Sequence, residues 1–122
     1  MKGTLEETWP APTVAHVREA VDRLVKHFDP LRIVVFGSYA RGDSRPGSDL
    51  DLLVVLPEVV DKRETAVRMR RALADLPVPK DVLVTTPPEI ERRGDSTWHV
   101  VGIALQEGET VYEKTGSDGA GT

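Results

Sequence analysis

The sequence predicts an α/β domain, in the wider sense α+β, with a small mixed β-sheet flanked by helices. β-branched runs alternate with amphipathic helical stretches in the order αββαβα, and this alternation favours a sheet covered by helices. The 122 residues, 39% of them hydrophobic, can bury one core and leave no room for a second of ordinary size. We therefore expect one domain over residues 1–115, followed by a flexible Gly-rich tail over residues 116–122.

The first half of the chain predicts one helix and two strands. Apolar residues recur at three- and four-residue steps over residues 13–28, which indicates an amphipathic helix, and Asp29-Pro30 ends it. The β-branched run 31–36 predicts a strand. Residues 37–47 are rich in turn formers, and the apolar run 48–56 predicts a second, central strand.

The second half predicts a helix, a strand, a further helix and an edge strand. In chain order these elements are residues 62–76, 80–85, 98–106 and 109–113. Thr86-Pro87-Pro88 is expected to break the chain after the strand. Trp98 is interpreted as core packing at the start of the last helix.

Composition excludes several classes of function. Sixteen Lys and Arg residues against twenty Asp and Glu residues give a formal net charge of -4, which argues against direct binding of nucleic acid through its phosphates. The absence of cysteine excludes disulfides, thiolate nucleophiles and cysteine-ligated metal clusters. No apolar run is long enough to span a bilayer, so we expect a cytoplasmic protein without a membrane partner.

A pair of acids marks the start of the second predicted strand. Residues two apart on a strand point to the same face, with Cα atoms roughly 6.5 Å apart, so Asp49 and Asp51 are expected to share one site. A lone Asp-x-Asp pair fits the wet face of an amphipathic strand. Here the following run 52–56 is apolar on both faces. Two like charges at the start of such a strand repel each other unless a cation lies between them. Carboxylates suit Mg²⁺, so a divalent-metal site is favoured.

Gly37-Ser38 ends the first predicted strand. Glycine lets the backbone approach a ligand closely, and free amides at a strand-to-helix turn can bind phosphate oxygens together with the Ser38 hydroxyl. Gly-Ser on its own is a common turn. Beside the acid pair, it places an anion site next to a cation site, which is the layout that a metal-bound nucleoside triphosphate needs.

Gly37-Ser38, ten intervening residues and Asp49-x-Asp51 resemble the signature of the DNA polymerase β-like nucleotidyltransferase superfamily. The longer segment 37–55, GSYARGDSRPGSDLDLLVV, resembles its minimal nucleotidyltransferase (MNT) branch. The resemblance covers residues 33–85 and implies the polymerase β-like fold with a third carboxylate on the next long strand. Asp81 stands where that acid is expected, although alone it would be an ordinary residue at a strand start.

The resemblance also implies a metal set. In the superfamily, three acids hold two Mg²⁺ ions while a nucleotidyl group is transferred by in-line attack on the α-phosphorus. Carried over to this chain, Asp49 and Asp51 would bridge both ions, and Asp81 would hold the ion on the acceptor side. If Asp81 does not fill this role, Asp75 is the next candidate.

The same resemblance assigns the phosphate-binding residues. Gly37 and Ser38 would bind the β- and γ-phosphates of ATP or another nucleoside triphosphate. Arg41 and Ser48 lie inside the motif and would contact phosphate or brace the loop. Arg41 could equally pair with a carboxylate within the fold.

The minimal branch resembles the antitoxin half of toxin–antitoxin pairs whose other half is a helical HEPN-domain ribonuclease. We therefore expect a Mg²⁺-dependent enzyme that transfers AMP from ATP to a hydroxyl on a HEPN toxin, a partner that would supply the acceptor that so short a chain lacks. Two alternatives stay open: a non-catalytic antitoxin that masks its partner, and an aminoglycoside-like nucleotidyltransferase that modifies a small molecule. The sequence also leaves open the acceptor, the nucleotide and the formation of a homo- or hetero-oligomer.

Overall fold

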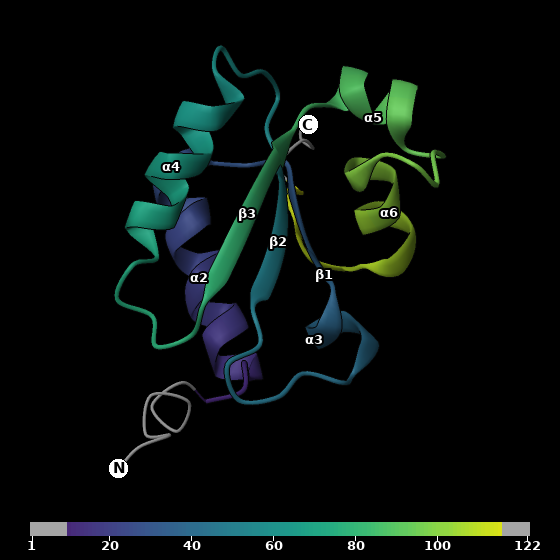
Figure 1. The fold of residues 1–122 in the computed structure, drawn as a ribbon. Helices are drawn as coiled ribbons and strands as arrows, with labels where there is room; N and C mark the ends of the chain where they lie inside the picture. The colour runs from purple at the N-terminus through teal and green to yellow at the C-terminus, as the bar shows by residue number, and fades with distance from the viewer. Residues whose placement is uncertain (1–9, 116–122) are drawn as a thin grey trace.

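A single mixed sheet organises the computed structural model, which describes residues 10–115 (Figure 1). Its strands lie in the order β3-β2-β1-β4. β1 pairs antiparallel with both β2 and β4, and β2 pairs parallel with β3. The strands are β1 (Arg32–Phe36), β2 (Leu50–Val55), β3 (Lys80–Thr85) and β4 (Glu109–Glu113). The predicted mixed sheet is confirmed, while the predicted tail lies outside the described residues.

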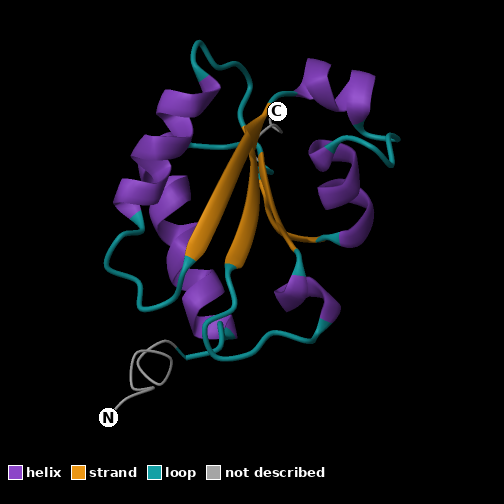
Figure 2. Cartoon of the chain, viewed as in Figure 1, coloured by secondary structure: helices purple, strands orange, loops and turns teal. Residues whose placement is uncertain are grey.

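Helices cover both faces of the sheet (Figure 2). One face carries two long helices and the other carries two shorter ones, and a single-turn helix follows β1. The first face holds α2 (Val14–Phe28) and α4 (Lys62–Ala72), the second holds α5 (Pro87–Arg93) and α6 (Val100–Glu107), and the single turn is α3 (Ser38–Arg41). In the described part of the chain, none of these helices has the length and apolar character needed to cross a membrane.

The core explains why β2 is central. Leu50, Leu52 and Val54 pack toward α2 and α4, and Leu53 packs toward α6. All four side chains are fully buried, so β2 is apolar on both faces, as its sequence predicts. The strand therefore provides a rigid base for the polar residues at its amino-terminal end.

Three local predictions are wrong. Pro87 and Pro88 begin α5 instead of breaking the chain, because proline lacks an amide hydrogen and is well suited to the first turn of a helix. Residues 38–41, predicted as part of a turn, form α3. Trp98, predicted to lie in the core, is 94% exposed, because it lies in the segment before α6, whose buried residues begin at Val101.

A buried carboxylate ties α5 to the sheet and to α4. Glu89 accepts hydrogen bonds from the buried Thr85 hydroxyl at 2.6 Å and from Lys62 Nζ at 2.7 Å. Burial by itself would raise the pKa of Glu89, but the hydrogen bonds from Lys62 and Thr85 outweigh it and hold this pKa below its ordinary value. The ionised form of Glu89 therefore stabilises the fold.

We expect Glu89→Gln to lower the free energy of unfolding by about 1–2 kcal/mol at pH 7, because the variant loses charged hydrogen bonds in a buried position. Urea denaturation measures the difference, with the exposed Glu91→Gln on the same helix as control. A carboxylate with a depressed folded-state pKa stabilises above its unfolded pKa, so the advantage of the wild type should vanish as the pH falls through the folded-state pKa of Glu89. Equal midpoints for Glu89→Gln and Glu91→Gln at pH 7 would contradict this role.

Candidate active site

The three predicted acids meet at one end of the sheet. Asp51 on β2 lies in register with Asp81 on the parallel neighbour β3 and with Phe36, the last residue of β1. Paired residues on adjacent strands lie about 5 Å apart, so Asp51 and Asp81 are close neighbours. Asp49, one residue before β2, is exposed at the same end. Tertiary structure thus brings together two acids at the start of β2 and one acid from thirty residues after Asp51 in the chain.

Burial and the two neighbouring acids act together on the carboxyl of Asp51. Burial of its carboxyl, and then the negative charges of Asp49 and Asp81, raise the pKa of Asp51 to about 6, and the positive charge of Arg41 acts in the opposite direction. A partly buried carboxylate with two further negative charges near it forms a site at which a bound divalent cation would reduce the repulsion. The donors are hard carboxylate oxygens, the chain has no cysteine thiolate to compete with them, and this set suits Mg²⁺.

Gly37 lies directly against this cluster. A Cβ atom added to Gly37 would lie 2.1 Å from Asp51 Oδ2, and the backbone there has φ 75° and ψ -152°, a conformation that only glycine adopts readily. Gly37 also caps α3, whose first residue is Ser38. The first amides of a helix have no acceptor within that helix, so the turn presents N–H groups beside the acids.

Arg41 and Ser48 both make contacts within the fold. Arg41 Nε lies 3.5 Å from the carboxylate of Asp43, and its Nη1 lies 3.7 Å from Glu107 on α6. The Ser48 hydroxyl accepts a hydrogen bond of 2.8 Å from the Arg45 amide. Ser48 therefore braces the loop before β2, while Arg41 pairs with carboxylates and still influences Asp51.

The side chain of Asp81 makes contacts of its own, with the next residue of β3 and with α4. Its Oδ1 accepts a hydrogen bond of 3.0 Å from the Val82 amide and lies 3.7 Å from Nη1 of Arg70 on α4. Consistent with these contacts, no three acidic or histidine side chains within residues 10–115 are gathered as a ready-made cage for an ion. The residues fit a divalent ion by charge and chemistry. The sequence offered no local signal for Arg70, because its partner lies on another element.

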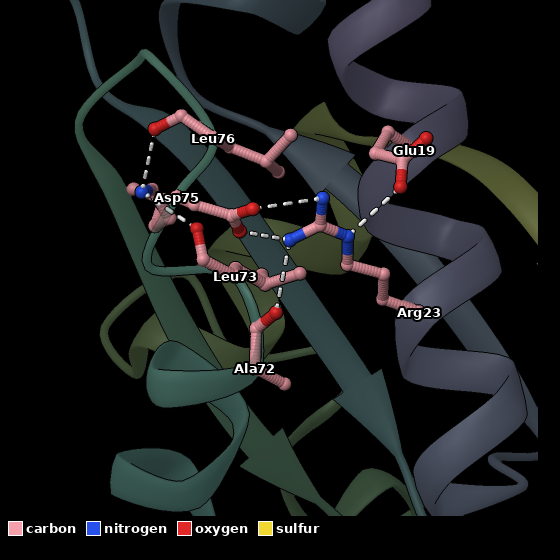
Figure 3. A network of polar contacts seen from close by, with 7 residues as sticks. Glu19, Arg23, Ala72, Leu73, Asp75 and Leu76 are labelled. Carbon is pink, nitrogen blue, oxygen red and sulfur yellow. Dashed lines mark hydrogen bonds and ion pairs between the residues drawn. The ribbon is translucent and has the colours of Figure 1, made fainter.

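Asp75, the alternative third acid, belongs to a different contact. Arg23 on α2 forms a close ion pair with the Asp75 carboxylate and also donates hydrogen bonds to the Ala72 carbonyl at 3.2 Å and to Glu19 at 2.8 Å (Figure 3). The hydrogen bond from Arg23 holds the pKa of Asp75 below its ordinary value. Asp75 therefore fixes the loop between α4 and β3.

The neighbouring lysine fixes the start of β3. Lys80 Nζ donates hydrogen bonds to the carbonyl of Leu73, the C-cap of α4, at 2.8 Å and to that of Leu76 in the following loop at 3.0 Å. Lys80 immediately precedes Asp81, so the same loop contacts that end α4 also set the backbone position of Asp81.

Residues 14–111 match the model of the family described as the nucleotidyltransferase domain. The chain belongs to this family. The match spans both halves of the motif and the strand that carries Asp81, and it confirms the family resemblance drawn from Gly37-Ser38 and Asp49-x-Asp51. No protein of curated function matches the chain in sequence.

Solved structures share the fold of this nucleotidyltransferase domain. A nucleotidyltransferase structure from Sulfolobus solfataricus aligns with a TM-score of 0.57 at 20% identity, covering 82% of this chain and 79% of that one. Two variants of a toxin–antitoxin complex, MntA-HpeT, align with TM-scores of 0.52 and 0.51 at 20% and 17% identity. These alignments cover 84% and 83% of this chain and 76% and 75% of the matched chains. At such identities, the likeness establishes the fold.

Proposed function

We propose that this domain transfers AMP from Mg²⁺-bound ATP to a hydroxyl group on a protein partner. The observation that supports this most strongly is the placement of Gly37 against Asp51, with Asp49 and Asp81 beside it. An anion-binding turn and a set of repelling carboxylates at one point suit a triphosphate and the cations that accompany it. Neither group alone would serve this chemistry.

Each residue has a separate part in the proposed reaction. Asp49, Asp51 and Asp81 would hold two Mg²⁺ ions, and the Gly37-Ser38 turn would bind the β- and γ-phosphates. When bound, the ions would offset charge on the phosphate oxygens and favour ionisation of the acceptor hydroxyl. The acceptor oxygen forms a bond to the α-phosphorus, the bond from that phosphorus to pyrophosphate breaks, and the hydroxyl proton is released.

We further propose that the partner is a HEPN-type toxin and that the transfer silences it. Support comes from the MNT resemblance of segment 37–55 and from the fold shared with the toxin–antitoxin complexes. An AMP group adds a negative phosphodiester and bulk. Close to an RNA-binding surface, both would oppose the approach of RNA.

Intact-mass measurement tests the reaction. Incubating the chain with the HEPN-type toxin and Mg²⁺-ATP is expected to raise the mass of the toxin by one or more AMP units. The gain in mass should be absent in EDTA, which removes the cations, and with Asp49→Asn, which removes a carboxylate proposed to hold them beside the triphosphate. Asp95→Asn, which neutralises an exposed acid on another loop, serves as the matched control and should leave the gain intact.

The masking alternative gives the opposite pattern. If Asp49→Asn neutralises the toxin at full strength with no change in mass, the chain acts by binding alone. If transfer continues unchanged in EDTA, the proposed role of divalent ions is wrong.

A further inference from the structure

The outer edge of β3 is open in the part of the chain that the structure describes. β3 ends the strand order, and in Figure 1 it faces the viewer between α4 and α6. Leu50 and Leu56 donate their amides to the carbonyls of Pro79 and Thr85, so these alternate positions of β3 face β2. By the two-residue period of a strand, the amides of Val82 and Val84 point outward. An open edge of this kind can accept a further strand.

A groove of about 300 Å³ runs along this edge. Its apolar lining comes from α4, β3 and α6, namely Ala66, Val82, Leu83, Val84, Val100 and Val101. Val100, the first residue of α6 and part of this lining, is 44% exposed, and Trp98, two residues earlier in the chain, is 94% exposed. A nearly fully exposed tryptophan beside an apolar groove is typical of a protein interface.

The polar side chains that line the groove are Lys62, Arg63 and His99, and none of its lining residues is acidic. Lys62 is paired with Glu89, whereas Arg63 forms no ion pair with a carboxylate of the described residues. On a chain with a net charge of -4, this local basic excess favours an occupant with acidic groups beside apolar ones.

The edge leads directly to the proposed active site. Asp81 is the second residue of β3, and its carboxylate accepts a hydrogen bond from the outward-pointing amide of Val82. A strand added along this edge would compete for that amide. The carboxylate of Asp81 would then be free to turn toward Asp51, its register neighbour on β2.

We propose that an extended segment of the partner protein, carrying apolar side chains flanked by acidic ones, docks as an added strand on the outer edge of β3, with Trp98 and Arg63 as its main side-chain contacts. This proposal rests on the proposed function, because the segment belongs to the protein that carries the acceptor hydroxyl. Docking at this edge brings the acceptor to the acids and releases Asp81 from Val82.

Hydrogen–deuterium exchange tests the site on the complex of the full chain with the HEPN-type toxin. Formation of the complex is expected to slow exchange at the amides of Val82 and Val84. Trp98→Ala and, separately, Arg63→Glu are each expected to weaken the complex tenfold or more. Calorimetry should show Mg²⁺-ATP binding unchanged in both variants. Val14→Ala, at a 57% exposed apolar residue on α2, is the matched control and should bind the toxin like the wild type.

Each other result would overturn the proposal in a recognisable way. Slowed exchange on another face, or wild-type affinity in both variants, would exclude this docking edge, whereas the dependence of transfer on Asp49 judges the reaction separately. Slowed exchange at Val82 in the chain alone as its concentration rises would identify a second copy as the occupant. Failure of the wild type to bind the toxin at all would reject both the partner and the edge assigned to it.

Discussion

Replacing Asp51 by Asn is expected to lower the rate of AMP transfer by about 10³-fold, or roughly 4 kcal/mol in activation free energy. Asp51 is the most buried of the three acids, and both neighbouring acids act on its charge. Losing that charge removes the ligand proposed to bridge both ions, so Mg²⁺-ATP binding should weaken as well. Single-turnover transfer measured by intact mass, with calorimetry of Mg²⁺-ATP, tests both effects.

The same substitution is expected to stabilise the fold in the absence of divalent ions. A carboxyl whose pKa is raised to about 6 in the folded state binds its proton more tightly there than in the unfolded chain. The stability of the wild type should therefore fall as the pH rises from about 4 to about 6. At pH 7.5 in EDTA, Asp51→Asn should melt at a higher temperature than the wild type. This difference in melting temperature should disappear below pH 4.

The matched control for Asp51→Asn is Asp95→Asn, which removes an exposed acid away from the cluster. It should change neither the transfer rate nor the pH dependence of melting. Transfer at the wild-type rate by Asp51→Asn would show that this acid is not in the catalytic set. An unchanged melting temperature in EDTA at pH 7.5 would show that burial and the neighbouring acids do not raise the pKa of Asp51 as inferred.

Gly37→Ala is expected to abolish measurable Mg²⁺-ATP binding and transfer. The new Cβ would lie 2.1 Å from Asp51 Oδ2, so either the carboxylate or the turn must move. The backbone conformation at Gly37 would add strain of about 1–3 kcal/mol in a residue with a side chain. Calorimetry with Mg²⁺-ATP measures the binding, and thermal melting measures the strain.

Gly42→Ala separates these two effects. Gly42 also has a positive φ, of 81°, but a Cβ there meets nothing within 4 Å. This variant should lose some stability and keep Mg²⁺-ATP binding. If Gly37→Ala and Gly42→Ala bind the nucleotide equally well, the close approach of Gly37 to Asp51 has no functional meaning.

Local sequence was sufficient to predict most of the sheet and the centre of the site. The β-branched runs place β1, β2 and β3 because such side chains favour extended backbone, and the double-sided apolar run of β2 indicates its central place. The site motif is equally local, since Gly37 directly follows β1 and Asp51 lies on β2, and these two strands are joined by one connection and paired in an antiparallel register. Proline patterns were less informative, because Pro87 suits either a break or the first turn of α5.

Tertiary structure alone decided what surrounds these residues. The register of β3 puts Asp81 beside Asp51, whereas the Asp81 carboxylate contacts Arg70 on α4, and Asp75 is engaged in an ion pair with Arg23. The sequence determined the family, the strands and the candidate acids, because these depend on residue type and short spacing. Side-chain orientation, the raised pKa of Asp51 and the exposure of Trp98 depend on segments distant in the chain, whose proximity only the folded core establishes.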